Sequence, residues 1–466
     1  MMHYSTHDLN DTIVALATPT GVGAIGVIRL SGKQAIEIAD QVFPAKKLSE
    51  QPTHTLHFGT IRDSENRIID EVVVSLFKGP KSYTGEDVVE VSCHGSNYII
   101  QQLIQLFIDR GARLAQPGEY TLRAFLNGRM DLSQAEAVAD LIASSSEAAH
   151  DLALRQMRGG FSDEIQQLRQ QLLDFASLIE LELDFSEEDV EFANREELHK
   201  LVVKIKTLLR SLLQSFQLGN AIKQGVNTVI AGRPNAGKST LLNALLNEER
   251  AIVSDIAGTT RDTIEETLNI EGIQFRIIDT AGIREAQDQI EAIGVEKTME
   301  KIEQSSILVY VFDAANTPPA DVRTDLANLY RPGLHLLVVA NKMDRNPYAK
   351  AKDFLDPTTA DQHTWVPVSA LNRMNIGYLK ELLYQSVVDE KVKLDSTIVS
   401  NARHYAALQQ AYESLDTVQK GLDSGITSDF IAMDIRRGLA YLGEITGEVS
   451  TDDLLGNIFG RFCIGK

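Results

Sequence analysis

The sequence is poor in cysteine, in long apolar runs and in signals for export. Cys93 and Cys463 are its two cysteines among 466 residues, so the chain has no disulfide framework and no cysteine cluster with metal-ligand spacing. No stretch approaches the roughly 20 apolar residues that a membrane-spanning helix needs. Residues 1–10 are polar and lack a basic segment followed by an apolar one. We therefore expect a cytoplasmic protein with no membrane partner.

Positive charge is also in short supply. The chain has 45 Lys and Arg against 65 Asp and Glu, which gives a formal net charge of −20. Proteins that coat nucleic acid electrostatically need many cations facing phosphates. Any RNA contact must therefore use a local basic patch.

The hydrophobic pattern of the first half predicts strands and then helices. Strand-like runs with turn-rich separators occupy 12–17, 24–30, 55–61, 69–77 and 88–93, and a helix is expected over 97–110. The pattern is helical from Ser133 to about Gln217, with Ser133 and Glu136 at the spacing of a capping box. We interpret the acidic run 187–191 as a solvated loop within this region, and the alternative is a metal site.

The second half alternates short apolar runs with helical segments. The runs are 227–231, 275–279, 307–313, 335–341 and 365–368, and the alternation predicts a doubly wound parallel sheet. Helices are expected again over 398–421 and 428–443, packed on those that precede the sheet. The fold class is multidomain α/β, with an N-terminal α+β domain (1–125), a discontinuous helical domain (126–220 and 390–466) and an inserted Ras-like P-loop GTPase domain (221–389).

A phosphate-binding motif follows the first run of this sheet. Residues 232–239 read GRPNAGKS, which matches G-x-x-x-x-G-K-S between a predicted strand and an apolar helix. The glycines let backbone N–H groups converge on phosphates, Lys238 reaches the β and γ oxygens, and Ser239 ligates Mg²⁺. Asn235, Ala236, Gly237 and Thr240 belong to the same predicted cradle.

Three more motifs close later strands in the order expected of a GTPase. They are Asp279-Thr280-Ala281-Gly282 for Mg²⁺ and the γ-phosphate, Asn341-Lys342-Met343-Asp344 for guanine, and Ser369-Ala370 to complete the base pocket. A carboxylate at Asp344 can accept two hydrogen bonds from guanine. Thr260, between the phosphate loop and Asp279, is the candidate for completing the Mg²⁺ shell. These motifs together predict GTP hydrolysis.

The group that orients the attacking water is not the usual one. Ras-like enzymes often use a Gln directly after D-x-x-G, but Ile283 occupies that position. The polar segment 284–296 is the nearest alternative source, and Glu291 is its leading candidate. Glu291 could equally be one solvated charge among several.

The flanking segments carry a second set of motifs: Thr18-Pro19, Tyr83-Thr84-Gly85-Glu86-Asp87, His94-Gly95, Pro117-Gly118-Glu119, Arg123-Ala124-Phe125-Leu126-Asn127-Gly128 and Phe462-Cys463-Ile464-Gly465-Lys466. Through these motifs the whole chain resembles the tRNA modification GTPases of the MnmE (TrmE) family. Ribosome-assembly GTPases share Gly258 to Asp262 but lack these segments.

For the GTPase domain, the resemblance implies a homodimer whose two nucleotide domains meet across their switches, with K⁺ in the place of an arginine finger. It assigns Glu291 to orienting the water indirectly, alongside Lys238 and Thr260. The implied K⁺ ligands are Asn235, Ser254, Ile256 and Thr259, of which Ser254 and Thr259 also border GTP, and the implied switch residues are Arg261, Asp262 and Arg284.

For the N-terminal domain, the resemblance implies a site for a 5-formyl-tetrahydrofolate-like one-carbon donor. The matching positions are Arg29, Glu90, Arg129 and Lys466. Arg129 departs from the family, which usually has lysine there, and a guanidinium differs from an ammonium in geometry. Cys463 could be a reactive thiol or an inert one.

The implied reaction adds a carboxymethylaminomethyl-type group to C5 of wobble uridine 34 in certain tRNAs. It uses an FAD- and NADH-dependent MnmG (GidA)-type partner, which forms a heterotetramer with the chain. Two alternatives stay open at this point. The chain could be a ribosome-assembly or regulatory switch, and the N-terminal domain could serve dimerisation alone.

Overall fold

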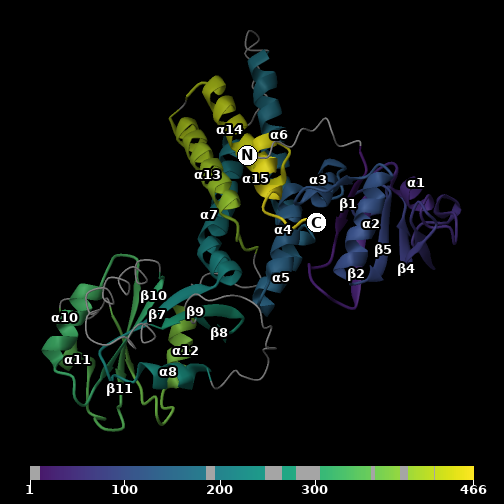
Figure 1. Ribbon diagram of the computed structural model, residues 1–466. Helices are drawn as coiled ribbons and strands as arrows, with labels where there is room; N and C mark the ends of the chain where they lie inside the picture. The colour runs from purple at the N-terminus through teal and green to yellow at the C-terminus, as the bar shows by residue number, and fades with distance from the viewer. Residues whose placement is uncertain are drawn as a thin grey trace. The chain divides into compact units, whose positions relative to one another are not determined.

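The computed structural model describes residues 11–184, 195–246, 265–279, 305–357, 363–388, 397–424 and 426–465 (Figure 1). The chain forms two compact units. The first comprises Met1–Ala143, Ala153–Lys206 and Gln410–Lys466, and the second comprises Ser144–Leu152 and Thr207–Gln409. Within the described residues, no helix combines the length and the apolarity that crossing a bilayer requires.

The first unit contains a six-stranded sheet in the order β3-β4-β5-β2-β1-β6. All neighbours are antiparallel except β1 and β6. Helices α1 and α2 cover one face, where Ile28, Val74 and Phe107 belong to a fully buried core. The bounds are β1 (Ile13–Leu16), β2 (Ile25–Ser31), α1 (Ala35–Asp40), β3 (Thr55–Arg62), β4 (Ile68–Phe77), β5 (Val88–His94), α2 (Asn97–Asp109) and β6 (Arg113–Leu114).

The helical part of the chain comes from both sides of the nucleotide-domain segment. Helix α14 packs against α6, and α15 packs against α3, which confirms that the C-terminal helices pack on helices that precede that segment. The bounds are α3 (Glu119–Leu126), α4 (Leu132–Ala143), α5 (Glu147–Met157), α6 (Gly160–Asp184), α7 (Arg195–Gln224), α13 (Ala402–Asp423), α14 (Ser428–Thr446) and α15 (Asp452–Phe459). The acidic run 187–191 lies outside the described residues.

Helix α4 is capped by a different pair from the one that its sequence pattern indicates. The Asp131 carboxylate accepts hydrogen bonds from the Gln134 N–H (2.9 Å) and the Ser133 hydroxyl (2.8 Å), and the Gln134 side chain accepts from the Asp131 N–H (2.9 Å). The prediction of a box between Ser133 and Glu136 is therefore wrong. Asp is as good an N-cap as Ser, and its charge also favours the positive end of the helix.

The second unit contains a six-stranded sheet in the order β12-β11-β10-β7-β9-β8. Helices α8 and α12 contribute to the core on one face, and α10 and α11 to the core on the other. Strand β8 is antiparallel to β9, so the sheet is parallel except at this edge. The bounds are β7 (Val226–Ala231), α8 (Lys238–Leu246), β8 (Glu265–Ile270), β9 (Ile273–Asp279), β10 (Ile307–Asp313), α10 (Pro319–Leu329), β11 (His335–Asn341), α11 (Ala351–Phe354), β12 (Thr364–Pro367) and α12 (Ile376–Gln385).

Candidate functional site

The phosphate loop joins the end of β7 to the start of α8. Gly232 has φ +152°, and a Cβ there would lie 2.0 Å from the Val311 carbonyl oxygen of β10. Only glycine therefore fits at this position, where the loop passes close to the neighbouring strand. The Lys238 ammonium donates to the Gly232 and Arg233 carbonyls at 2.8 and 3.1 Å. Ser239, next along the chain, is exposed in the first turn of α8.

Asn341 connects the phosphate loop to the predicted base pocket. Its amide nitrogen donates to the Ala236 carbonyl at 2.8 Å, and its amide oxygen accepts from the Ala370 N–H at 3.0 Å. Asn341 is buried, and a Cβ at Gly237 would lie 2.3 Å from the Asn341 nitrogen. One side chain therefore holds the P-loop and the Ser369-Ala370 segment in a fixed relation, which requires glycine at position 237.

Lys342 strengthens the same connection. Its ammonium donates to the Asn235 carbonyl at 2.7 Å and to the Asp313 carboxylate at 2.8 Å. Burial raises the pKa of Asp313, but hydrogen bonds from Lys342, Asn316 and a backbone N–H outweigh it and leave that pKa below its ordinary value. The charged pair therefore persists at neutral pH.

The predicted guanine carboxylate lies beside the fourth motif. The Ser369 hydroxyl donates to one oxygen of Asp344 at 2.6 Å. Ser369 is buried, whereas Asp344 is exposed. The hydroxyl therefore orients the carboxylate while leaving it accessible to a base.

A contact that the motif analysis missed holds the other side of the loop. Arg233 forms ion pairs with Asp321 and with Asp325, the latter at 2.7 Å, and the Tyr310 hydroxyl donates to Asp325 at 2.6 Å. The two carboxylates are four residues apart on α10 and so share a face. The sequence signal for this contact was the four-residue spacing of Asp321 and Asp325, together with an arginine at a variable position of the phosphate loop.

The remaining predicted nucleotide residues are only partly described. Asp279 is the last residue of β9, paired in register with Ile230 of β7, and Thr240 is exposed in α8. The others lie outside the described residues: Ser254, Ile256, Thr259, Thr260, Arg261, Asp262, Thr280, Ala281, Gly282, Arg284 and Glu291.

In the first unit, Arg29 of β2 lies at the centre of the predicted donor site. Its guanidinium pairs with Glu90 of β5 at 2.8 Å and donates to the Gly465 carbonyl at 3.3 Å. It also lies over the rings of Tyr83 and Tyr120, with 5.7 and 5.6 Å to the centroids. The two tyrosines are contacts that the sequence analysis missed, although Tyr83 lies in a motif that carries the family resemblance.

Of the other two predicted donor residues, the structure describes Arg129, which lies next to Gly85 of the segment that carries Tyr83. Arg129 is exposed, and a Cβ at Gly85 would lie 3.3 Å from its side chain. A Cβ at Gly465 would lie 2.3 Å from the Leu16 carbonyl oxygen, so the C-terminal segment lies directly on β1. Lys466 follows and lies outside the described residues.

The two cysteines have different surroundings. Cys93 is buried, its thiol donates to the Gly26 carbonyl, and burial raises its pKa to about 11. Such a thiol is unreactive at neutral pH. Cys463 is exposed, and its carbonyl accepts from the Gly118 N–H at 3.3 Å. Both alternatives for the Cys463 thiol, reactive and inert, stay open.

Comparison with known proteins gives matches along nearly the whole chain. A family model described as the MnmE helical domain matches residues 132–463, and one described as the GTP-binding protein TrmE N-terminus matches residues 12–129. The tRNA modification GTPase MnmE of Cytophaga hutchinsonii is 58% identical over 456 residues, which cover 98% of each chain. That of Christiangramia forsetii is 54% identical over 475 residues, which cover 98% of this chain and 100% of the relative.

A solved GTP-binding protein from Sulfolobus solfataricus, in complex with GDP, is 16% identical and covers 59% of this chain and 78% of its own. Its TM-score is 0.28.

A phosphate loop and a guanine motif that lie at the ends of parallel strands, joined through Asn341, define a P-loop GTPase. The identities to these relatives and the two family models then indicate the family within this class. The chain belongs to the MnmE (TrmE) family of tRNA modification GTPases.

Proposed function

We propose that this chain hydrolyses GTP in a K⁺-dependent way and, with a flavin-dependent partner, adds a carboxymethylaminomethyl-type group to C5 of uridine 34 in certain tRNAs. The observation that carries the GTPase part is the side chain of Asn341, which fixes the phosphate loop against the base motif. Relatives more than 50% identical along the whole chain are named tRNA modification GTPases, and this supports the tRNA part.

Nucleoside mass spectrometry tests the tRNA part. Cells that lack the chain should lose an aminomethyl-type C5 modification at wobble uridine, and a plasmid copy should restore it. A plasmid that carries Lys238→Ala is the matched control, because this variant lacks only the ammonium proposed to bind phosphate, and it should fail to restore the modification. Unchanged nucleosides in the deletion strain would favour an assembly or regulatory switch instead.

Two cations belong to the proposed GTPase mechanism. Ser239, at the exposed start of α8, fits Mg²⁺ together with Thr260 and the motif that begins at Asp279. We assign Asn235 to K⁺, because it is exposed on the phosphate loop at φ +60° and its side chain carries an amide oxygen that can ligate a cation, while its backbone carbonyl accepts from Lys342. A cation held by these residues would stabilise the charge that develops during hydrolysis.

In this mechanism, residues of the chain position the nucleotide and the water. Lys238 neutralises the β and γ oxygens, while Asp344 accepts hydrogen bonds from guanine. We assign Glu291 to orienting the water, with the switch residues Arg261, Asp262 and Arg284 ordering the closed state. Replacement of Glu291 by Ala should slow turnover while GTP affinity stays nearly unchanged, and normal turnover would dismiss this assignment.

The proposed one-carbon donor is a 5-formyl-tetrahydrofolate-type molecule, bound at Arg29, Glu90, Arg129 and Lys466. Arg29 and Glu90 place opposite charges side by side on one sheet face, which suits a ligand that carries both carboxylates and a hydrogen-bonding ring. Saturable binding of 5-formyl-tetrahydrofolate would support this assignment if Arg29→Ala weakens the binding and Arg67→Ala leaves it unchanged. Arg67 is the matched control because it forms an exposed pair with Asp63 in the same domain.

We also propose a homodimer in the cytoplasm that binds an MnmG (GidA)-type FAD- and NADH-dependent partner and reaches tRNA through that complex. The sheet of the first unit has an exposed apolar face suited to contact with a second copy. Leu56 and Phe58 of β3 are 71% exposed, and Val73 of β4 lies opposite Phe58. Phe58→Asp should raise the dissociation constant of the dimer in sedimentation experiments.

A further inference from the structure

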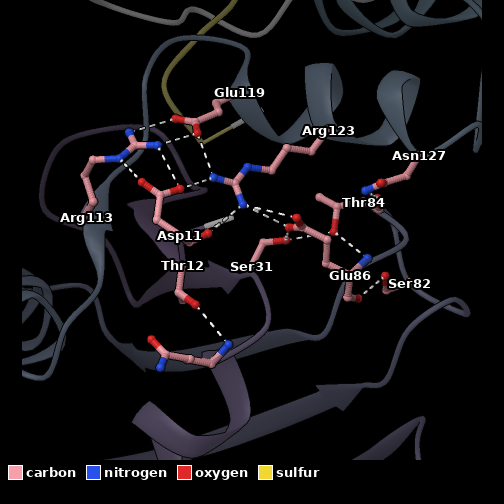
Figure 2. Close-up of polar contacts among 11 residues, drawn as sticks. Asp11, Thr12, Ser31, Ser82, Thr84, Glu86, Arg113, Glu119, Arg123 and Asn127 are labelled. Atoms are coloured by element: carbon pink, nitrogen blue, oxygen red, sulfur yellow. Dashed lines mark hydrogen bonds and ion pairs between the residues drawn. The ribbon is translucent and has the colours of Figure 1, made fainter. Parts of the chain in front are cut away.

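A buried ionic cluster joins α3 to the N-terminal sheet (Figure 2). The Arg123 guanidinium donates to the Asp11 carboxylate at 2.7 Å, to Glu119 at 2.9 Å and to Glu86 at 3.2 Å. Arg113 bridges Asp11 and Glu119 at 2.6 and 2.7 Å. Arg123 and Glu119 are each 1% exposed.

One member of this cluster belongs to the loop that spans residues 82–87. The second oxygen of Glu86 accepts from the Ser31 hydroxyl at 2.7 Å, and Ser31 lies 2.7 Å from the Thr84 hydroxyl. Because an ionised carboxylate can only accept, Ser31 donates to Glu86 and Thr84 donates to Ser31. Asn127, the C-cap residue of α3, donates to the Thr84 carbonyl at 2.8 Å (Figure 2). The loop is thus held by α3 and by β2.

The same loop carries Tyr83, whose ring lies beside the Arg29 guanidinium. The Tyr83 hydroxyl is 2.9 Å from that of Thr121. Tyr120 lies beside the same guanidinium, and its hydroxyl donates to the Arg29 carbonyl at 2.6 Å. Helix α3 therefore provides one aromatic contact to Arg29 directly and holds the other through the loop.

Stability alone is a weak reason for keeping such a cluster. Removing the Arg123 guanidinium and the Glu119 carboxylate from water costs several kcal/mol per ion, and apolar replacements of similar ion clusters are often neutral or stabilising. An arginine that forks between three acceptors does, however, fix their relative positions. Of these acceptors, Glu86 is the one that belongs to the loop beside Arg29.

We infer that Arg123 is a positioning residue of the one-carbon donor site, because through Glu86 it holds the loop 82–87 so that Tyr83 lies against the guanidinium of Arg29. This inference rests on the proposed donor site. A ligand that binds a cation already held in place loses less conformational freedom on binding. A loosened loop should therefore weaken ligand binding without unfolding the domain.

The test compares two isosteric substitutions in one cluster, made in the full chain. Glu86→Gln weakens the contact to the loop, whereas Glu119→Gln weakens contacts to Arg113 and Arg123 but leaves Glu86 in place. Calorimetric titration with 5-formyl-tetrahydrofolate should give about a tenfold weaker Kd for Glu86→Gln and less than a twofold change for Glu119→Gln. Hydrogen exchange of the amides in 82–87 should be faster in Glu86→Gln.

The outcomes separate this inference from the donor site itself. Equal affinity losses in the two variants would indicate a merely structural cluster and overturn the inference, as would an unchanged Kd in Glu86→Gln. Absence of saturable binding by the unaltered chain would overturn both the donor site and the inference. If Glu86→Gln fails to fold, Ser31→Ala is the second variant, because it removes a weaker contact to the same carboxylate. It should weaken binding about threefold. An unchanged Kd in Ser31→Ala would again overturn the inference.

Discussion

The nucleotide site of the second unit and the donor site of the first unit differ in how the chain assembles them. The described nucleotide residues lie at or shortly after the carboxyl ends of the parallel strands β7, β9, β11 and β12. The donor cluster, in contrast, joins residues as far apart as Arg29 and Gly465, which are 436 positions apart. A site of the first kind depends on backbone geometry at a few fixed positions, and one of the second kind depends on how separate segments pack.

The nucleotide site should therefore be sensitive to a single added methyl group at one of these fixed backbone positions. Gly237→Ala places a Cβ 2.3 Å from the Asn341 amide nitrogen at φ +93°. The lost hydrogen bond and the strained backbone each cost on the order of 1–3 kcal/mol, so GTP affinity should fall roughly 300-fold in a titration with a fluorescent analogue. Gly333→Ala is the control, because Gly333 has φ +83° but no atom within 4 Å of the added Cβ. Equal affinity in both variants would contradict the role of Asn341.

The base pocket should show the next largest effect. Asp344→Asn removes the carboxylate that Ser369 orients, so GTP affinity should fall about 100-fold while xanthosine triphosphate binds better. Asp353→Asn, an exposed residue of α11 in the same unit, should change neither. Unaltered discrimination between the two nucleotides in Asp344→Asn would show that the base binds elsewhere.

The fold of the nucleotide unit was predictable because its central strands are buried on both faces. Strand β10 is buried at every residue, and such strands appear in the sequence as continuous apolar runs. The runs 307–313 and 335–341 agree with β10 and β11 in full. Strand β8 escaped prediction because it is an edge strand with the polar sequence EETLNI, in which no apolar run stands out.

The contacts of the two sites were less predictable than their motifs. The motif analysis found Lys238, Asn341 and Asp344 because phosphate and guanine recognition requires those residue types at strand ends. It did not find the pairing of Arg233 with α10, and it did not assign Tyr83 to Arg29. Both depend on tertiary packing between segments, for which spacing along the chain gives little information.

Acid should affect the ionic cluster of the first unit in a defined direction. Burial raises the pKa of Glu119, but hydrogen bonds from Arg113, a backbone N–H and Arg123 outweigh it and hold that pKa below its ordinary value. A lowered folded-state pKa adds stability above the unfolded value of about 4, and this stability is lost as the pH falls through the folded-state value.

Glu119→Gln should therefore lower the free energy of unfolding by about 2 kcal/mol at pH 7, because it weakens hydrogen bonds to charged groups, and its deficit should shrink as the pH falls below about 4. Thermal denaturation of the two proteins across this range measures the difference. Glu50→Gln, in the exposed pair with Lys47, should show little deficit at any pH, because water and salt screen such pairs. A deficit in Glu119→Gln that persists unchanged at pH 3 would contradict the ionic explanation.

The smallest expected effect concerns whether GTP hydrolysis needs a monovalent cation bound at the phosphate loop. If K⁺ binds at Asn235, turnover of GTP should be about tenfold faster in KCl than in NaCl of equal ionic strength, which corresponds to about 1.4 kcal/mol in the barrier. Asn235→Ala should remove this difference, because it deletes the side-chain amide and leaves the carbonyl that Lys342 contacts. Asn346→Ala is the matched control, since the Asn346 amide donates to the Ala314 carbonyl, away from the phosphate loop. Equal rates in the two salts would contradict the K⁺ proposal. They would mean that residues of the chain stabilise the developing charge without a monovalent cation.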